Sequence, residues 1–525
     1  MAEAAPTARD ALEALERHFG YASFRPGQSE VISAVLEGRD VLAVMPTGAG
    51  KSVCYQIPAV LLGGLTLVIS PLISLMGDQV RALKEAGIRG SYLNSSLTPR
   101  QQDIVVQRAL DGWYDVMYVA PERLRDARFR SFAAAAQVPL VAVDEAHCVS
   151  QWGQDFRPAY RDIAEFVESL PARPVVAALT ATATSKVRDD IVSLIGLRDP
   201  VVQVNGFDRP NLALFSYELT PKRREQFIIA YALRRAGQSG IVYATTRKGV
   251  DALAGRLRDA GVSAVAYHAG MDNDARLEAQ RRFVVDDAQV MVATNAFGMG
   301  IDKSDVRYVM NAGLPLSVEE YYQEAGRAGR DGEPAECFLL WSRGDIRTCH
   351  FLIDNTEFAP DVPGSERRRL IDNRERLLGE MIGYAMSDSC LHRRILRYFG
   401  QDLSEVPESC DACSVCTDAS PEAYLRHAAT PRSTGRARRE TSVTWDGPRA
   451  PSDDDDELFQ RLRALRKELA DDGSVPPYVI FSDATLRGMV RRRPKDGDEL
   501  LQVSGVGAVK LRRYGDAFLE EINRA

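Results

Sequence analysis

Short apolar segments alternate with longer, mostly polar segments over the first 345 residues of the chain. Between about residues 28 and 200 the apolar segments read DVLAVMP, LTLVISP, DVMYVAP, LVAVDE and VVAALTAT. Apolar strands separated by helix-length segments are typical of a parallel sheet with helices on both faces. The pattern therefore predicts an α/β domain over residues 1–205.

The same pattern restarts with GIVYATT, VSAVAYHAG, QVMVATNAF and VRYVMNAGLP, which predicts a second α/β domain over residues 206–345. The two domains look like a duplicated architecture. After FLLWSRGD the strand pattern stops, and residues 346–416 read as helices that end in a group of cysteines.

The remainder of the chain divides into a linker and a small helical domain. Residues 417–456 are rich in Pro, Ser, Thr, Arg and Asp with almost no apolar periodicity, which indicates a flexible linker. Helical periodicity returns over residues 457–525, with Leu458, Leu462, Leu465 and Leu469 on one face. The predicted fold class is thus multidomain α/β, with two parallel-sheet lobes, a helical cysteine-bearing module, a linker and a small all-α domain.

Composition narrows the class of protein. The chain has 525 residues, 45% hydrophobic and 26% charged, which is ordinary for a globular protein of several domains. No apolar run is long enough to span a bilayer and no signal peptide is recognisable, so we expect a cytoplasmic location. The net charge of -7 argues weakly against a chain that coats nucleic acid, so phosphate binding would need local patches.

The octapeptide MPTGAGKS, residues 45–52, follows an apolar strand and precedes a helix-like segment. A phosphate-binding loop requires this context, because glycine lets backbone N–H groups approach phosphate. Lys51 would reach the β and γ phosphates and Ser52 would ligate Mg²⁺. The strict pattern has Gly where this chain has Met45, and a bland turn before a helix is the alternative. The candidate phosphate-binding residues are Thr47, Gly48, Gly50, Lys51 and Ser52.

Two further segments complete a hydrolase site. The strand LVAV delivers Asp144 to the carboxyl end of a sheet, where it would hold Mg²⁺ while Glu145 orients and deprotonates the attacking water. An acid pair could instead cap a helix, but Lys51 and Ser52 upstream favour catalysis. QEAGRAGRDG offers Arg327 and Arg330 to stabilise charge on the γ-phosphate, with surface salt bridges as the alternative.

Four of the eight cysteines cluster. CDACSVC places Cys410, Cys413 and Cys416 at two-residue gaps, and Cys390 lies upstream at the start of CLHRRILRYFG. In a reducing compartment such a group favours tetrahedral Zn²⁺, although an iron–sulfur cluster uses similar spacing. His392 could compete with Cys390 as the fourth ligand.

Eight motifs, in chain order, closely resemble those of the RecQ family of superfamily 2 DNA helicases. They are FGYASFRPGQSEVI, MPTGAGKS, VISPLISLMGDQV, YVAPERL, VDEAHCVSQWGQDFRPAY, LTATAT, VATNAFGMGIDKSDVRYV and YYQEAGRAGRDG, within residues 9–416. The C-terminal segment separately resembles the HRDC domain. The resemblance implies two RecA-like lobes and ATP-driven 3′-to-5′ unwinding in recombination and repair, including the SOS response.

The resemblance also assigns residues. It implies that Phe24, Arg25 and Gln28 recognise adenine, and that Thr180 and Thr182 couple hydrolysis to lobe movement. It matches Gly300 and Asp302 to the nucleotide-side motif of the second lobe, and it favours zinc, with Cys390 as the fourth ligand. His392 then faces solvent or DNA, and Arg393, Arg394, Arg397 and Tyr398 would touch phosphate or form a solvated helix face.

The loop after DEAH resembles the aromatic-rich loop of the family, whose planar side chains meet single-stranded bases. Trp152, Phe156, Arg157 and Tyr160 would then report bound DNA to Glu145. A core role for Phe156 and Tyr160 is the alternative, because aromatic side chains are more often packed than displayed.

The chain departs from typical bacterial members, which carry a winged-helix domain of roughly a hundred residues where this chain has its linker. Without the winged-helix domain, anchoring of the protein at a DNA fork is in doubt. Four arginines of the linker would either substitute for that domain by neutralising phosphates or simply belong to a solvated tether: Arg432, Arg436, Arg438 and Arg439. In the HRDC-like segment, Gly505 and Gly507 resemble a phosphate-binding turn supported by Lys510, Arg512 and Arg513. Tyr478 and Phe481 resemble DNA-facing positions, with a core or protein-docking role as the alternative.

The leading hypothesis is an ATP- and Mg²⁺-dependent helicase acting on single-stranded and forked DNA, nucleoid-associated if bacterial. Its expected partners are a single-strand DNA-binding protein and recombination proteins. The alternatives are a translocase or nucleoprotein remodeller with weak unwinding, and an annealing or scaffold factor. Only the resemblance selects DNA over RNA, because stacking and phosphate contacts do not read the sugar.

Overall fold

The computed structural model describes residues 6–153, 155–297, 303–356, 363–425, 453–473 and 475–524. The chain divides into two compact units, Met1–Phe207 with Val479–Ala525, and Asp208–Tyr478. Most of the predicted linker, and Gly300 and Asp302, lie outside the described residues.

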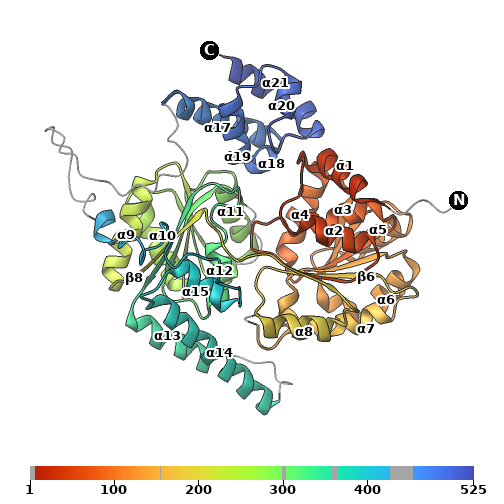
Figure 1. Cartoon of the computed structure of the whole chain (residues 1–525), viewed down its shortest axis with the longest axis horizontal. Helices are drawn as coiled ribbons and strands as arrows, with labels where there is room; N and C mark the ends of the chain where they lie inside the picture. Colours follow the sequence, from red (N-terminus) through yellow and green to blue (C-terminus); the bar gives the residue numbers. More distant parts are fainter. Residues whose placement is uncertain are drawn as a thin grey trace. The chain divides into compact units, whose positions relative to one another are not determined.

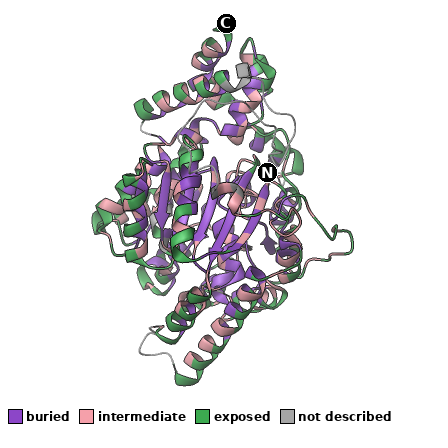
Figure 2. Cartoon of the chain, turned by 90° about the vertical axis from the view of Figure 1, so that its left-hand side faces the viewer, coloured by how far each residue is buried: buried purple, intermediate pink, exposed green. Residues whose placement is uncertain are grey.

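Lobe 1 is built on a parallel seven-stranded sheet with the strand order β3-β4-β2-β5-β6-β1-β7 (Figure 1). Most of its strand residues are buried, as expected when helices cover both faces, and Figure 2 shows strands as the most buried layer. The strands are β1 (Val41–Val44), β2 (Thr66–Ile69), β3 (Gly90–Leu93), β4 (Val116–Val119), β5 (Leu140–Val143), β6 (Val175–Thr180) and β7 (Val201–Val204). The five strands predicted here are confirmed, whereas β3 and β7 were not predicted.

Three helices of lobe 1, Ala8–Phe19, Pro99–Leu110 and Ala127–Ala135, begin at a capping side chain. The Thr98 side chain accepts from the backbone N–H of Gln101, whose side chain accepts from the Thr98 backbone, so two otherwise unpaired donors are satisfied. The helices are α1 (Ala8–Phe19), α2 (Gln28–Leu36), α3 (Val53–Leu61), α4 (Ile73–Glu85), α5 (Pro99–Leu110), α6 (Ala127–Ala135), α7 (Asp162–Glu168) and α8 (Ser185–Ile195), with short 3₁₀ turns η1 (Pro121–Arg125), η2 (Ala146–Val149) and η3 (Pro158–Arg161).

Lobe 2 contains a second parallel sheet of six strands in the order β10-β11-β9-β12-β13-β8. Its elements are β8 (Leu212–Glu218), α9 (Pro221–Arg234), β9 (Ser239–Ala244), α10 (Arg247–Asp259), β10 (Ala264–Tyr267), α11 (Asn273–Val284), β11 (Val290–Ala293), η4 (Asn295–Phe297), β12 (Val306–Ala312), α12 (Val318–Ala325) and β13 (Ala335–Trp341). The prediction of a second α/β domain is confirmed, although edge strand β8 was not predicted.

Helices follow β13, as the end of the strand pattern predicts. They are α13 (Arg343–Asp354), α14 (Gly364–Ala385), α15 (Leu391–Tyr398), α16 (Glu422–Leu425), α17 (Asp453–Gly473), α18 (Pro477–Ile480), α19 (Asp483–Arg492), α20 (Gly497–Leu501) and α21 (Ala508–Asn523). Among the residues that the structure describes, no helix has the length and apolarity needed to cross a membrane.

Helix α17 packs against lobe 2 through charged as well as apolar side chains. Arg466 is only 1% exposed and lies 3.6 Å from the carboxylate of Asp305. The Asp305 carboxylate also pairs with the buried ammonium of Lys303 at 2.9 Å. Burial opposes ionisation, but the charges of Lys303 and Arg466 hold the pKa of Asp305 below its usual range. The predicted leucine face therefore shares α17 with an ionic contact that hydrophobic periodicity does not reveal.

Asp40, which precedes β1, links three strands of lobe 1. Its side chain is 3% exposed and accepts hydrogen bonds from the Arg173 guanidinium at 2.6 and 3.1 Å. It also accepts from the backbone N–H groups of Val176 at 2.9 Å and Arg198 at 2.8 Å. Asp40 thus fixes β1 relative to β6 and to the turn before β7, and with β1 the start of the phosphate-binding loop.

We expect Asp40→Ala to lower the opening free energy of lobe 1 by about 3 kcal/mol, because it removes the ion pair with Arg173 and leaves the backbone N–H groups of Val176 and Arg198 without this acceptor. Hydrogen exchange of the β1 and β6 amides measures this change. Glu37→Ala, which removes an exposed ion pair with Arg39, is the control and should shift these amides by less than about 0.5 kcal/mol. Equal protection in the two variants would contradict the role given to Asp40.

Candidate nucleotide, zinc and DNA sites

The loop between β1 and α3 has the geometry of a phosphate cradle. Gly48 and Gly50 have φ values of 84° and 81°, a left-handed conformation that favours glycine. The Lys51 ammonium donates to the Met45 carbonyl at 3.2 Å, and Thr47 and Ser52 lie half-buried on the same segment. The strand–loop–helix context predicted for residues 45–52 is therefore present.

Two of the three residues assigned to adenine recognition, Arg25 and Gln28, are hydrogen-bonded to this loop. The Gln28 amide, at the start of α2, donates to the carbonyls of Ala49 at 3.1 Å and Gly50 at 3.0 Å. The Arg25 guanidinium donates to the Gly48 carbonyl. Phe24 packs partly buried against the apolar cluster beneath α1 and α2. The structure thus brings the two predicted motifs together, while their contact with a base stays a prediction.

Asp144 and Glu145 follow β5 directly and lie at the carboxyl end of the sheet. The half-buried Asp144 carboxylate accepts hydrogen bonds from the Ser70 hydroxyl at 3.4 Å and the Glu145 backbone N–H at 3.0 Å. Removal from water raises the pKa of Asp144 to about 6, and the charge of Glu145 adds to this whereas that of Lys51 opposes it. Two acids in this environment fit a divalent cation, which Asp144 and Ser52 would hold through oxygen.

A contact that sequence reasoning missed connects the acidic turn with the LTATAT segment. Glu145 has a φ of 47°, unusual for a residue other than glycine and common at functional turns. His147 Nδ1 lies 2.9 Å from the Thr180 hydroxyl at the end of β6. Burial lowers the pKa of His147 to about 4, so its ring is neutral near pH 7. The DEAH sequence and Thr180 were each singled out, but their spacing gives no sign of this bond.

The four residues predicted to meet DNA in the aromatic-rich loop have different environments. Trp152 is 37% exposed. Phe156 is half-buried, and the Arg161 guanidinium lies 4.9 Å from the centroid of the Phe156 ring. Arg157 pairs with Asp155 at 3.0 Å. Tyr160 is fully buried and donates to the Asp144 carbonyl at 2.8 Å. Direct base contact by Tyr160 is therefore wrong for this structure, because its hydroxyl braces the acidic turn instead.

In lobe 2, Arg327 and Arg330 both lie beyond the end of α12. Arg327 is 5% exposed, and Arg330 is half-buried. The intervening turn is held by the Arg209 guanidinium, which donates to the carbonyls of Ala328 at 3.1 Å and Gly329 at 3.0 Å. Arg209 was not predicted, because FDRPN carries no periodic or motif pattern that marks it.

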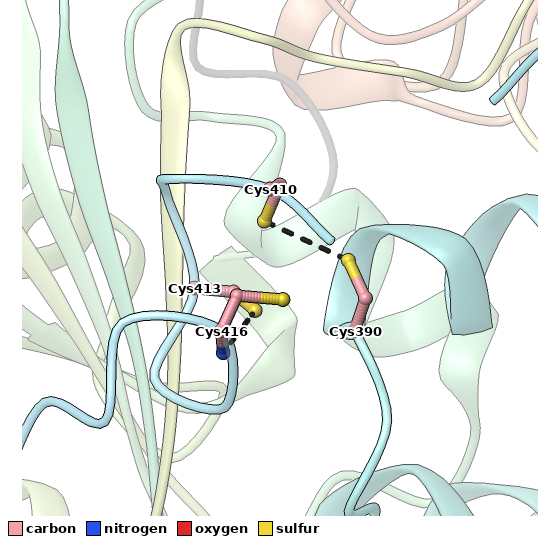
Figure 3. A group of neighbouring side chains, drawn as sticks. All are labelled: Cys390, Cys410, Cys413 and Cys416. Atoms are coloured by element: carbon pink, nitrogen blue, oxygen red, sulfur yellow. Dashed lines mark hydrogen bonds between the residues drawn. The ribbon is translucent and has the colours of Figure 1, made fainter. Parts of the chain in front are cut away.

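The four predicted cysteines converge in one cluster (Figure 3). Cys390 precedes α15 and faces Cys410, while Cys413 and Cys416 lie on the following turn. Every pair of sulfur atoms lies within 4.8 Å, and those of Cys390 and Cys410 are 3.6 Å apart. Tetrahedral zinc with bonds near 2.3 Å requires sulfur separations of about 3.8 Å, so the cluster fits this ion.

The cysteine turn is joined to the edge of the lobe 2 sheet. The Leu214 N–H on β8 donates to Ala412 at 2.8 Å, and the Ser414 N–H donates to Leu214 at 2.9 Å. His392 lies outside the cluster and pairs with Asp208 at 3.2 Å, so its alternative role as fourth ligand is wrong.

The basic helix α15 has partners within the chain. The Arg393 guanidinium donates to the carbonyl of Pro407 at 3.1 Å and to that of Val406. The Tyr398 hydroxyl donates to Glu319 at 2.5 Å. These contacts favour a packing role over the phosphate contacts predicted for the two residues.

The predicted DNA contacts of the HRDC region are mostly covered. Gly507 lies against Gly20, where an added Cβ would approach the Gly507 nitrogen to 2.4 Å. Lys510 is half-buried with Nζ 5.8 Å from the Phe481 ring centroid, and burial lowers its pKa to about 8. Phe481 packs in the core 4.9 Å from Phe518, as its alternative role predicted, and Tyr478 is half-buried. These contacts favour a packing role for the turn and for Lys510, while their binding of phosphate stays a prediction.

Four family models match the chain in order. The DEAD/DEAH box helicase model matches residues 25–191, and the helicase conserved C-terminal domain matches residues 223–332. The RecQ zinc-binding model matches residues 343–417, and the HRDC domain matches residues 455–522. The fold and these matches define a two-lobed helicase protein with a zinc module, so the cysteine cluster is a zinc site rather than an iron–sulfur site.

Curated relatives resolve the family. The chain is 39% identical to ATP-dependent DNA helicase RecQ of Bacillus subtilis, with 97% of each protein covered. It is 36% identical to the Pasteurella multocida protein of the same name, over 99% of this chain and 94% of that protein. The chain therefore belongs to the RecQ family.

A solved structure of Mss116p bound to ssRNA and AMP-PNP shares the fold. Its TM-score is 0.55 at 17% identity, and the match covers 74% of this chain and 88% of that chain.

We expect Cys413→Ser to abolish stoichiometric zinc binding, because three thiolates leave the tetrahedral site incomplete. Elemental analysis of the purified protein measures the metal, and hydrogen exchange at Leu214 and Ser414 reports loosening of the turn. Cys349→Ser is the control, since Cys349 is buried outside the cluster. Full zinc occupancy in Cys413→Ser would show that the metal is held elsewhere.

Proposed function

We propose that this protein is an ATP- and Mg²⁺-dependent DNA helicase that moves 3′ to 5′ along single-stranded DNA and separates duplexes during recombination and repair. The two closely matching RecQ relatives are named ATP-dependent DNA helicases, which supports ATP and DNA as its substrates. The proposal extends to forked DNA, to a single-strand DNA-binding protein and recombination proteins as partners, and to a place at the nucleoid.

One observation supports coupling between DNA and hydrolysis in particular. The Tyr160 hydroxyl donates to the Asp144 carbonyl at 2.8 Å, so the far end of the aromatic-rich loop is bonded to the acidic turn as well as joined to it by the chain. A DNA strand that stacks on Trp152 would move the aromatic-rich loop, which is anchored at both ends near Glu145. Base stacking worth about 1–3 kcal/mol per base is enough to bias such a turn.

The chemical roles follow from the side chains. Lys51 and the loop N–H groups bind phosphate, and Asp144 with Ser52 holds Mg²⁺, which neutralises charge on the phosphates when it is bound. Glu145 takes the proton of the attacking water. Arg327 and Arg330 supply positive charge for the γ-phosphate, and Gly300 and Asp302 complete the nucleotide-side motif of lobe 2.

We propose domain boundaries at residues 1–205, 206–345, 346–416, 417–456 and 457–525. Residues 418–454 separate the zinc-binding and HRDC matches, an interval too short for a winged helix. This spacing supports a second candidate function, a single-strand translocase or nucleoprotein remodeller with weak unwinding.

We expect Lys51→Ala and Glu145→Gln each to lower ATP turnover by about 10²–10⁴-fold, because one loses phosphate charge and the other loses the general base. Single-stranded DNA binding should persist in both variants. Steady-state phosphate release and fluorescence anisotropy with a labelled oligonucleotide measure the two properties. Lys84→Ala and Glu122→Gln, at exposed positions of lobe 1, are the matched controls. Wild-type turnover in Glu145→Gln would reject the assignment of the base.

Polarity is tested with the wild-type chain on duplexes that carry a 3′ or a 5′ overhang. We expect ATP-dependent unwinding of the 3′ substrate alone, because a motor that moves 3′ to 5′ along a single strand runs into the duplex only from a 3′ overhang. Strong DNA-stimulated ATPase without unwinding would favour the translocase. Unwinding of the 5′ substrate alone would contradict the proposed direction.

A further inference from the structure

Helix α8 holds the aromatic-rich loop at two points. The Lys186 ammonium, in the first turn of α8, lies 2.9 Å from the centroid of the Trp152 ring. One turn later, Asp190 accepts a hydrogen bond from the Ser150 hydroxyl at 2.6 Å. The Ser150 hydroxyl in turn accepts from the Trp152 backbone N–H at 3.1 Å. Positions four apart share one helix face, so one face of α8 fixes both the backbone and the ring of Trp152.

The cation lies where an indole attracts it most. The face of an indole is negative, and an ammonium over it is held even at an exposed site. Lys186 is exposed, whereas Ser150 is buried, so the contact to the ring is the adjustable one and the contact to the backbone is the fixed one. A ring held on one face presents the other face in a defined orientation, which stacking on a base requires.

The same helix begins where the LTATAT segment ends. Thr184 precedes Ser185, the first residue of α8. Four residues earlier, the Thr180 hydroxyl meets His147 at 2.9 Å and accepts from the Thr182 N–H at 3.2 Å. The acidic turn, Thr180, α8 and Trp152 therefore form a closed series of contacts, separate from the path through Tyr160.

We propose that Lys186 and Asp190 are positioning residues that set the Trp152 indole for stacking on single-stranded DNA and connect its movement to Thr180. This inference rests on the proposed function, since it requires single-stranded DNA to bind at the aromatic-rich loop. Neither residue is among those assigned here to nucleotide binding or hydrolysis. Their effect is on how much DNA is needed to stimulate hydrolysis and on how strongly bound DNA stimulates it.

The test is a series of α8 variants in the full-length protein, titrated with an oligothymidylate while ATP turnover is followed. Lys186→Met should raise the DNA concentration for half-maximal stimulation by about two- to fivefold, the effect of losing one exposed cation–π contact. Lys186→Arg should restore it, because a guanidinium also lies over aromatic faces. Asp190→Ala should act in the same direction as Lys186→Met.

Two comparisons separate positioning from simple attraction of phosphate. Arg188→Met removes a positive charge from α8 without touching the loop, because the Arg188 guanidinium donates to Ser185. It should shift the titration less than Lys186→Met does. In a Trp152→Ala background, Lys186→Met should cause no further shift, since the ring that it positions is gone.

The outcomes distinguish this inference from the proposed function. Wild-type protein that is not stimulated by DNA would overturn the proposed function and this inference with it. Normal wild-type stimulation with equal losses in Lys186→Met and Arg188→Met, or with additive losses in the Trp152→Ala background, would overturn the positioning role alone.

Discussion

The chemistry of lobe 1 depends on one geometric constraint, the ending of three adjacent parallel strands at the same edge of a sheet. Strands β5, β6 and β1 are neighbours in this order, and each is followed at its carboxyl end by a segment of the candidate nucleotide site. The Met45 N–H donates to the Thr180 carbonyl at 3.0 Å, which continues the ladder into the phosphate-binding loop. Backbone hydrogen bonds fix this edge of the sheet. They therefore also bring the lysine, the two acids and the threonine close together.

The same constraint explains which parts of the site could be predicted. Strands with continuous apolar residues, such as β1 and β5, can be recognised from the sequence. The residues that follow these strands directly can be located with them. Strand β7, with alternating half-buried and exposed residues, and β3, with only its first and last residues buried, lack this pattern because they lie at the edges of the sheet. Edge strand β8 was missed as well, although its partner β13 was visible.

Side-chain contacts between segments were the least predictable. The bond from Tyr160 to Asp144 and the burial of Arg466 depend on tertiary packing, which a periodic pattern does not encode. The sequence does not distinguish the exposed Trp152 from the bracing Tyr160, because both are aromatic residues of the same loop. Only the burial of the two side chains in the folded chain separates their roles. The cysteines were easier, because ligand number and spacing constrain a metal site before any packing is known.

Packing within lobe 2 explains how the chain tolerates so short an interval before its HRDC region. Tyr424 on α16 packs into an aromatic cluster with Phe227 at 5.5 Å and Phe338 at 5.6 Å, and its hydroxyl donates to Glu336 at 3.3 Å. Helix α16 thus packs against lobe 2 immediately after the turn that carries the cysteines. On the other side of the interval, Arg463 of α17 donates to the Gly237 carbonyl at 3.2 Å.

Both ends of the interval are therefore anchored on the same lobe. The entropy of closing a loop changes only slowly with its length, by about 0.6 kcal/mol for each doubling. Removing or inserting a domain between two such anchors alters neither the aromatic cluster nor the zinc turn. The length of the chain at such a position can change while the packing of lobe 2 stays as it is.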